Sequence, residues 1–497
     1  LDLTGDQSIL LGPDGPSLGG FVCSVTTAKG EMWKLGQLHP GDKVHFRLLD
    51  LDQAKEIREA EEANLRHEHQ EVVLPEQKDL DYHYAILAEE TAAGTKIVAR
   101  LDGEDNILVE YGEMELDIAI RFRVHVLMQE LKKKDLPVID LTPGIRSLQI
   151  HFDIEKISLK EMLAAVLETN RTLPELSDVT VPSRIIWLPL SWDDPQTQLA
   201  AKRYQQTVRP NAPWCPSNPE FIRRINGLDS IEDVKKIVFD ADYLVLGLGD
   251  VYLGAPVATP VDPRHRMVTT KYNPARPWTP ENAVGIGGAY LCVYGMEGPG
   301  GYQFVGRTIQ MWNPLKETEY FKHGKPWLLD FFDQIRFYPV SAEEILKDRE
   351  DFLRGRFKIK IEETSFNLGK YEQFLKEHED TIRAFKDHQE ASFEAERKMW
   401  KEKGLDEFDS ETQDAPAIVE ETVPDGCEAA RTNIPGSVWK VLVEDGQKVR
   451  EGDTLVILES MKMEFPVTAE YSGIIEKVYL KPGEQVNSGQ LAASIRV

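Results

Sequence analysis

Alternating apolar and polar residues predict β-strands in the first third of the chain. Tyr84–Ala88, Ile107–Tyr111 and Leu148–Phe152 have the β-branched, alternating character of half-buried strands. Ile118–Lys133 and Leu159–Thr169 instead repeat apolar residues at the 3.6-residue period of an amphipathic helix, and Ser158 precedes the second as a candidate N-cap. We therefore predict α+β elements within a multidomain, mainly β protein.

The pattern becomes helical after residue 341. Ser341 and Glu344 have the spacing of a capping box, and Tyr371–Lys401 carries Phe and Trp at helical spacing among Glu and Lys. We expect this aromatic stripe to be a packing face, not a cofactor site. These patterns predict a helical segment over residues 342–404. A charged stretch within residues 53–80 is also helical in composition and is predicted to be a connector.

The C-terminal part, residues 431–497, alternates apolar residues with glycine turns and contains a repeat. Gly436, Val441, Gly446, Val449 and Gly452 recur 37 positions later as Gly473, Val478, Gly483, Val486 and Gly489. Such a repeat predicts two similar sets of strands folded against each other. Lys462 falls between the two halves, where a hairpin tip would expose it to solvent.

Lys462 stands between Met461 and Met463 in the stretch Glu459–Phe465. With its repeat, this part resembles the biotinyl (biotin carboxyl carrier) domain, a flattened β-barrel. In the related lipoyl domain an acidic residue usually precedes the lysine, so Met461 favours biotin. The resemblance implies a covalent biotin on Lys462, attached by a biotin protein ligase. An ordinary surface lysine on a β-hairpin is the alternative.

Composition limits the remaining functions. A net charge of -26 argues against nucleic acid and an anionic membrane as partners. We find no apolar run long enough to span a bilayer and no signal peptide. Four cysteines without CxxC spacing predict reduced thiols in a cytoplasmic protein and no metal site. A homo-oligomer is compatible with the sequence.

An acidic stretch precedes the biotinyl part. Residues 405–425 contain eight acidic residues and no basic one, a composition that cannot bury a core. We predict a flexible linker over residues 405–430. Such a tether would let a carrier domain visit two sites, although a plain linker would have the same composition.

The richest candidate chemistry lies between residues 240 and 307. This stretch is rich in glycine, proline and polar residues, as are ligand-binding loops held on a rigid scaffold. Five groups that can carry positive charge fall within thirteen residues, namely Arg264, His265, Arg266, Lys271 and Arg276. In an otherwise acidic chain, this cluster predicts a pocket for an anionic intermediate, with arginine suited to bidentate carboxylate recognition.

The same residues carry a second resemblance. Residues 81–341 are similar to the allophanate-hydrolase-subunit-1 (KipI-like) family, and Pro13–Phe21 resembles the end of the companion subunit-2 (KipA-like) family. Both families are built on cyclophilin-like β-barrels. Two internal matches, including Asp42–Phe46 with Asp333–Phe337, agree with related domains. We therefore predict that residues 1–52 are the C-terminal tail of a KipA-like carboxyltransferase domain whose first half is absent.

Joined to a biotinyl domain, these parts resemble the carboxyltransferase and carrier portion of the urea carboxylase family. The resemblance implies a multifunctional enzyme of urea degradation, a C–N-forming ligase, in which CO2 passes from carboxybiotin to urea to give allophanate. Asp262 would accept hydrogen bonds from urea, and Arg264 or Arg266 would hold the carboxylate. Lys271 would add positive potential, and His265 would orient or relay a proton. Secondary contacts would come from Tyr272, Asn273, Arg276, Tyr290 and Tyr302.

The resemblance also implies what other parts must supply. No phosphate-cradling glycine loop occurs in the sequence, so ATP, Mg and bicarbonate would act through a biotin carboxylase domain outside this chain. The missing half of the carboxyltransferase would be a further partner. Guanidine is an alternative substrate by the same chemistry. An acyl-CoA or pyruvate carboxylase is a second hypothesis, and a 5-oxoprolinase- or kinase-inhibitor-like KipI protein is a third.

Overall fold

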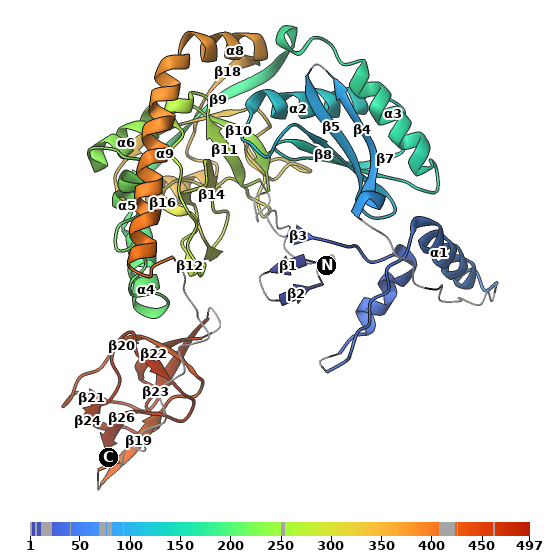
Figure 1. The fold of residues 1–497 in the computed structure, drawn as a ribbon. Coiled ribbons are helices and arrows are strands. Elements are labelled where there is room, and N and C mark those ends of the chain that lie inside the picture. Colours follow the sequence, from blue (N-terminus) through green and yellow to red (C-terminus); the bar gives the residue numbers. More distant parts are fainter. Residues whose placement is uncertain are drawn as a thin grey trace. The chain divides into compact units, whose positions relative to one another are not determined.

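The structure is a computed structural model of the 497-residue chain, drawn in Figure 1. It describes residues 2–4, 7–10, 22–39, 41–68, 76, 82–92, 94–249, 254–406, 423–424, 426–460 and 463–497. Two compact units are formed. Unit 1 holds Leu1–Pro182, Gly249–Val251 and Ser365–Glu377, and unit 2 holds Ser183–Leu248, Tyr252–Thr364 and His378–Val497.

A five-stranded antiparallel sheet forms the core of unit 1. Its order is β4 (Ile86–Ala92), β5 (Thr95–Leu101), β6 (Asn106–Tyr111), β8 (Ser147–Phe152) and β7 (Val138–Pro143). In β6 and β8 every second residue is buried, because alternate side chains of a strand point to opposite faces. The strands predicted around residues 107 and 148 are thus confirmed. The strand predicted at Tyr84–Ala88 begins two residues later than expected, at Ile86, because Tyr82–Ala85 forms the short 3₁₀ helix η2.

The two helices predicted for this region are confirmed. Helix α2 (Ile118–Lys132) contacts β7 and β8 and buries Phe122 and Leu127, and α3 (Leu159–Arg171) packs beside it. Ser158 caps α3 in a reciprocal capping box, in which its side chain accepts from the Glu161 N–H and Glu161 accepts from the Ser158 N–H. The short 3₁₀ helix η3 (Leu176–Asp178) follows.

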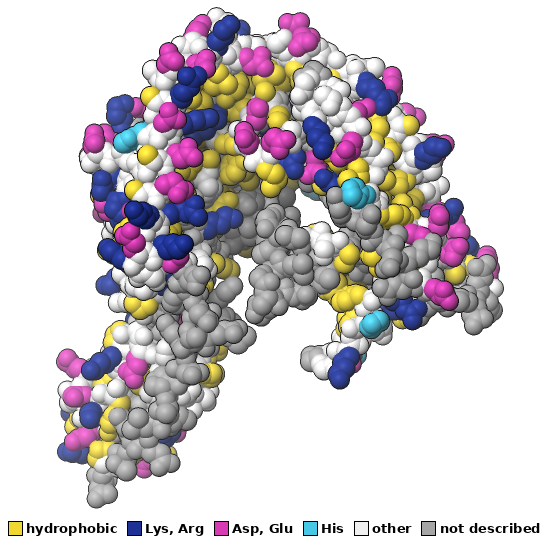
Figure 2. Space-filling view, viewed as in Figure 1, with side chains coloured by type: hydrophobic (Ala, Val, Ile, Leu, Met, Phe, Trp, Pro, Cys, Tyr) yellow, Lys and Arg dark blue, Asp and Glu magenta, His cyan; other side chains and the backbone are white. Residues whose placement is uncertain are grey.

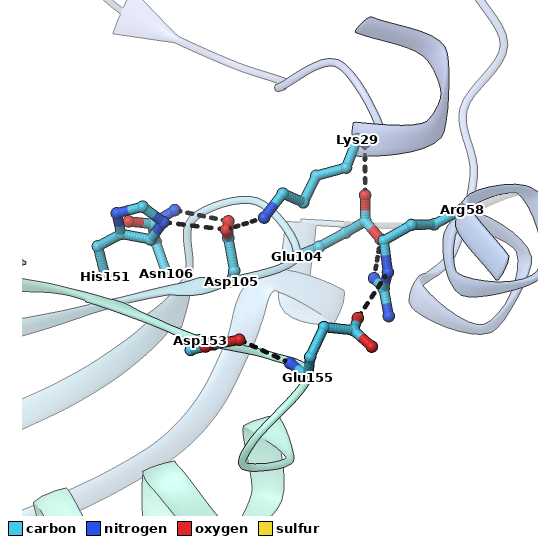
Figure 3. A network of polar contacts seen from close by, with 8 residues as sticks. All are labelled: Lys29, Arg58, Glu104, Asp105, Asn106, His151, Asp153 and Glu155. Atoms are coloured by element: carbon cyan, nitrogen blue, oxygen red, sulfur yellow. Dashed lines mark hydrogen bonds and ion pairs between the residues drawn. The ribbon is translucent and has the colours of Figure 1, made fainter. Parts of the chain in front are cut away.

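The N-terminal part of unit 1 is joined to this sheet by ion pairs. It comprises the small sheet β2 (Gln7–Ile9), β1 (Asp2–Thr4) and β3 (Val22–Cys23), then the 3₁₀ helix η1 (Lys29–Gln37) and α1 (Leu51–Leu65). Figure 3 shows Lys29 paired with Asp105 and Arg58 paired with Glu104. The Arg58–Glu104 distance is 2.6 Å. These pairs attach η1 and α1 to the β5–β6 turn. Residues 42–46 have no regular secondary structure, whereas their sequence match at 333–337 lies largely in a strand.

Unit 2 contains a closed β-barrel of seven strands. The order is β16 (Gln303–Arg307), β13 (Ala283–Gly287), β14 (Tyr290–Val293), β11 (Pro256–Pro260), β10 (Tyr243–Leu248), β17 (Gln334–Val340) and β9 (Thr180–Trp192), and β16 pairs with β9 to close it. Buried aliphatic side chains such as Leu188, Val245 and Val284 fill its core. The mainly β, barrel-forming fold expected from the sequence is therefore confirmed.

Helices and short strands surround the barrel. They are α4 (Pro195–Thr207), α5 (Asn218–Ile225), α6 (Ile231–Asp240), the 3₁₀ helix η4 (Pro263–His265) and the strand pair β12 (Arg276–Thr279) and β15 (Gly298–Gly300). On the face drawn in Figure 2, basic and acidic side chains intermingle over the described helices of unit 2. A single basic patch of the kind that binds nucleic acid is not seen on that described face.

The segment after residue 341 is helical only in part. Ser341 caps α7 (Ala342–Leu353) in the predicted capping box, and α8 (Leu368–Glu377) and α9 (Glu379–Glu402) follow. Between them Lys360–Asn367 forms strand β18, which adjoins β9 at the edge of the barrel sheet. The helical segment predicted over residues 342–404 is therefore interrupted by a strand, because pairing with β9 stabilises an extended conformation there.

The C-terminal domain consists of two four-stranded sheets that confirm the sequence repeat. One has the order β19 (Cys427–Arg431), β26 (Leu491–Arg496), β24 (Gly473–Val478) and β21 (Lys448–Val449), and the other β23 (Met463–Thr468), β22 (Thr454–Ser460), β20 (Gly436–Val441) and β25 (Gln485–Val486). Strands β20, β21 and β22 recur 37 positions later as β24, β25 and β26. Val438, Val456 and Ile475 lie in the core between the sheets. In the described part of the chain, no helix is both long and apolar enough to cross a membrane.

Candidate functional site

Lys462 belongs to the connection of a tight hairpin. Strands β22 and β23 pair in register until Ser460 opposes Met463, which leaves two residues between the strands. Lys462 itself lies outside the described residues, as do Pro13–Phe21 and most of the predicted 405–430 linker. A lysine amine in a two-residue hairpin connection fits covalent attachment of biotin, because the attaching enzyme must reach it.

Asp262 and Arg264 form an ion pair in the loop after β11. Asp262 caps η4 by accepting from the Arg264 backbone N–H at 2.9 Å, and the Arg264 guanidinium donates to both carboxylate oxygens, closest at 2.6 Å. Burial opposes the charge of Asp262, but Arg264 outweighs it and holds the pKa of the carboxyl below its ordinary value. Arg264 also donates to Thr381 of α9, so the pair fastens the loop to that helix.

His265 and Arg266 lie in the same turn. The Arg266 guanidinium donates to the carbonyl oxygens of Pro260 at 2.8 Å and Val261 at 3.2 Å. Gln389 of α9 donates to the Arg266 carbonyl at 2.9 Å. His265 Nδ1 is buried and has no hydrogen-bond partner among the described residues. Burial raises the pKa of Tyr290 on β14, and the nearby charge of Arg266 partly offsets this.

Tyr272 and Arg276 are buried in the body of unit 2. The Arg276 guanidinium lies 4.2 Å from the ring centre of Tyr272 and 3.8 Å from that of Phe304, and it donates to the Tyr302 carbonyl at 2.6 Å. The Tyr272 hydroxyl exchanges hydrogen bonds with Asn218. Burial raises the pKa of Tyr272 above its ordinary range. This geometry makes Arg276 a buried cation held between two aromatic rings.

Lys271 and Asn273 are exposed at the surface of the same loop. The Lys271 ammonium lies 5.3 Å from the ring centre of Tyr302, and Tyr302 covers Gly287 so closely that a β-carbon there would be 2.3 Å from its ring. Gly301 faces the stem of Lys271. Glycine at these places lets the lysine and the tyrosine ring lie against the strand backbone. Lys271, Asn273 and Tyr302 therefore offer an accessible cation beside a flat aromatic surface.

The predicted residues thus form two groups in the barrel part of unit 2. Asp262, Arg264, His265, Arg266 and Tyr290 form the first, and Lys271, Tyr272, Asn273, Arg276 and Tyr302 form the second. Strand β13 connects them, because its Gly287 pairs with Tyr290, and the following Gly288 forms a bridge with Thr269.

Gln303 and Thr270 are polar residues of this region that sequence reasoning did not single out. Gln303 is fully buried on β16, and its amide donates to the Thr270 carbonyl at 3.0 Å. Its Oε1 and the Thr270 hydroxyl are buried with no hydrogen-bond partner among the described residues. Such orphaned acceptors suit a ligand with N–H donors. A glutamine among apolar strand residues was the available sequence signal.

We also considered a cavity in unit 1, metal sites and the cysteines. A cavity of about 810 Å³ in unit 1 is lined largely by apolar residues such as Val25, Leu35, Phe46 and Ile57, and none of the predicted site residues lines it. Among the described residues, no group of His, Cys, Asp and Glu could hold a metal ion. The four cysteines all lie in the described part of the chain and form no disulfide there.

Three family models match the chain. They are "Carboxyltransferase domain, subdomain A and B" at residues 1–48, "Carboxyltransferase domain, subdomain C and D" at 97–321 and "Biotin-requiring enzyme" at 422–495. The chain therefore carries carboxyltransferase subdomains and a biotin domain. The C and D match extends from unit 1 into the barrel of unit 2.

Curated relatives match along the whole chain. The urea amidolyase of Lachancea kluyveri is 37% identical over 505 residues, and the alignment covers 100% of this chain and 27% of the relative. A putative urea carboxylase of Emericella nidulans is 30% identical over 534 residues, and that alignment covers 100% of this chain and 42% of the relative. The crystal structure of the Kluyveromyces lactis urea carboxylase is 37% identical with a TM-score of 0.76, over 97% of this chain and 42% of that one. The chain thus spans 27% to 42% of the length of these relatives.

Proposed function

We propose that this chain, which matches urea carboxylase along its length, is the carboxyltransferase and biotin-carrier portion of such an enzyme. It would transfer a carboxyl group from biotin on Lys462 to urea, giving allophanate. The proposal rests on one observation. A single chain holds both a hairpin whose connection contains Lys462 and, in the barrel part of unit 2, a loop with an accessible cation, Lys271. Neither feature alone defines this activity.

Biotin would supply a carboxyl group in activated form at the end of a long flexible arm. Lys462 would hold the biotin, and residues of the barrel part would bind the substrate and stabilise the charge that develops during transfer. The Lys271 ammonium is exposed and would stabilise the carboxylate and the oxyanion that develops on urea. Tyr302, which lies beneath that ammonium, would provide a flat surface that excludes water from one side of the planar substrate.

A second set of groups would orient urea. Urea is a neutral diamide with N–H donors on both nitrogens, so its binding calls for acceptors. The orphaned Oε1 of Gln303 and hydroxyl of Thr270 are such acceptors beside the Lys271 loop. Asp262 already accepts from the backbone N–H and the guanidinium of Arg264, so its contact with urea would require one of these hydrogen bonds to be released.

The remaining predicted residues are assigned supporting roles. Arg264 and Arg266 would hold the η4 loop and add positive potential, since both donate to groups of that loop. His265 would orient or relay a proton, and its buried Nδ1 has no hydrogen-bond partner among the described residues. Tyr272 and Arg276 would keep the Lys271 loop in place from below, and Asn273 would contact ligand at the surface.

The carboxyl group would be loaded elsewhere. ATP, Mg and bicarbonate would act at a biotin carboxylase domain, which none of the matched domains represents. A biotin protein ligase would modify Lys462. We expect a cytoplasmic enzyme, consistent with four cysteines that form no disulfide and with an acidic composition.

The test is product formation by the complete enzyme, assayed in parallel with urea and guanidine. We expect bicarbonate- and ATP-dependent formation of allophanate from urea, and loss of this activity in Lys462→Arg, which cannot carry biotin. Faster carboxylation of guanidine would reassign the substrate. Carboxylation of neither compound by fully biotinylated enzyme would refute the proposed reaction.

A further inference from the structure

One face of the C-terminal domain is buried although it does not belong to that domain's core. Leu458 lies in the core, and the next residue, Glu459, points to the opposite face of β22. Glu459 is nevertheless only 7% exposed. Trp439, at a bulge in the neighbouring strand β20, is 5% exposed and also lies outside the core cluster. Something other than the domain itself must cover these two side chains.

The covering element is helix α4 of the barrel part of unit 2. Arg203 Nε donates to Glu459 Oε2 at 2.9 Å, and the Thr207 hydroxyl donates to the same oxygen at 3.3 Å. The Arg203 guanidinium also lies 4.8 Å from the ring centre of Trp439. The backbone of Gly483 abuts the Gln206 carbonyl so closely that a β-carbon would lie 2.9 Å from it. The contact therefore combines an ion pair, a cation–π contact and close packing.

The chemistry of this contact is selective. Both partners of the Arg203–Glu459 pair are nearly buried, with side chains 10% and 6% exposed. A desolvated charge that loses its partner is costly, so such a pair favours one arrangement of the surfaces over others. Glu459 precedes Lys462 by only three residues, which places the pair beside the biotin-bearing connection of the hairpin.

The same helix supports the Lys271 loop with other side chains. The Tyr204 hydroxyl donates to the Pro274 carbonyl at 2.9 Å, and its ring meets that of Tyr272 edge-on, with the ring centres 4.7 Å apart. Just after the helix, Arg209 donates to the Asn273 carbonyl at 2.8 Å. Helix α4 therefore contacts the C-terminal domain and the candidate site at once.

We propose that α4 is the docking helix for the biotin-bearing domain of the same chain, and that the Arg203–Glu459 pair is the contact that selects the productive position. This inference rests on the proposed function. It adds a recognition surface that is separate from the groups proposed to bind urea. This surface would position biotin that is attached to the C-terminal domain, and it would have no effect on free biotin.

The test compares Arg203→Ala with Lys202→Ala in the complete biotinylated enzyme. Lys202 is the exposed neighbour on the same helix and serves as the matched control. Urea-dependent turnover is measured twice, once with the enzyme's own biotin and once with excess free biotin as the carboxyl carrier. Biotin occupancy of Lys462 is measured by avidin gel shift, and folding by thermal denaturation.

We expect Arg203→Ala to lower turnover with the enzyme's own biotin by at least about tenfold, since truncating one partner of a buried charge pair is costly. Turnover with free biotin, biotin occupancy and melting should match the Lys202→Ala control. The double variant Arg203→Glu with Glu459→Arg should recover part of the activity that Arg203→Glu loses, at equal biotin occupancy.

Three results would overturn the inference. Unchanged turnover with the enzyme's own biotin would show that the pair is not needed. Equal losses with both forms of biotin would show that Arg203 supports the barrel instead. Faster turnover would show that the contact holds the domain in a resting position. A wild-type enzyme inactive on urea with either form of biotin would instead refute the proposed function.

Discussion

At the scale of single residues, the structure separates the positive charges that look equivalent in the sequence. Arg264 is paired with Asp262, Arg266 donates to backbone carbonyls and Arg276 is held between aromatic rings. Lys271 is exposed, with its ammonium over Tyr302. The exposed lysine is the cation best placed to meet an anion from solvent, whereas the arginines shape the loops around it.

Lys271→Met tests this distinction, because it removes the charge and keeps the length of the side chain. We expect allophanate formation to fall about 100-fold to 1000-fold, the usual effect of removing a group that stabilises a developing oxyanion. Lys271→Arg should retain part of the activity, and Lys322→Met, at an exposed position of unit 2, should match the wild type. A Lys271→Met enzyme with wild-type turnover would remove this lysine from the site.

Arg276 gives the contrasting prediction. It is fully buried, so Arg276→Met should remove the cation–π contacts and the hydrogen bond to Tyr302, and destabilise the protein by about 2 kcal/mol or more. Thermal unfolding measures this loss, and Arg276→Lys should be milder because the charge remains. If Arg276→Met melts like the wild type yet transfers no carboxyl group, Arg276 acts on the ligand directly instead.

At the scale of elements, features formed by residues close together in the sequence were predicted correctly. Features that depend on residues far apart in the sequence were not predicted. Ser158 and Ser341 predicted helix starts because capping boxes are formed within four residues. Strand β18 was missed because its extended form depends on β9, which lies far away in the sequence. The burial of Arg276 between aromatic rings could not be predicted for the same reason, since Phe304 belongs to another strand.

The ion pairs that attach η1 and α1 to the β5–β6 turn predict an acid-sensitive contact. Burial opposes the charge of Asp105, but Lys29 and His151 outweigh it and lower the pKa of the carboxyl below its ordinary value of 3.8. Because the folded-state pKa is the lower one, Asp105 stabilises the fold fully above the ordinary pKa. That stabilisation is lost as the pH falls through the folded-state pKa.

Asp105→Asn should therefore destabilise unit 1 by about 2 kcal/mol at neutral pH and by progressively less below pH 4. Asp135→Asn, at an exposed position after α2, is the control and should leave melting unchanged at every pH. Hydrogen exchange in residues 29–65 reports directly on the attachment. An equal difference between variant and wild type at pH 3 and pH 7 would contradict the assigned role of the carboxylate.

At the scale of the whole molecule, biotin attachment and carboxyl transfer are assigned to different parts of one chain. Lys462 belongs to the C-terminal domain and Lys271 to the barrel, and the first can be disabled without touching the second. The repeat and the methionine-flanked lysine predicted the former from local sequence. The Arg203–Glu459 contact escaped prediction because its partners are 256 residues apart.

This division allows a complementation experiment with two inactive complete enzymes. Lys462→Arg lacks a biotin carrier but has an intact barrel, and Lys271→Met carries biotin but lacks the proposed transfer site. Because α4 contacts the C-terminal domain of its own chain, we expect each carrier to serve the barrel to which it is joined. Covalent joining also gives the chain's own carrier a higher effective concentration at its barrel than a carrier on another molecule would have.

A mixture of the two variants should accordingly show no more allophanate formation than the sum of the separate proteins. Adding excess free biotin should restore turnover to the Lys462→Arg partner only, which verifies that its barrel remains competent. Recovery of a large part of wild-type activity in the mixture, without free biotin, would show that carriers cross between chains. In that case the α4 surface would have to accept the carrier domain of a second copy.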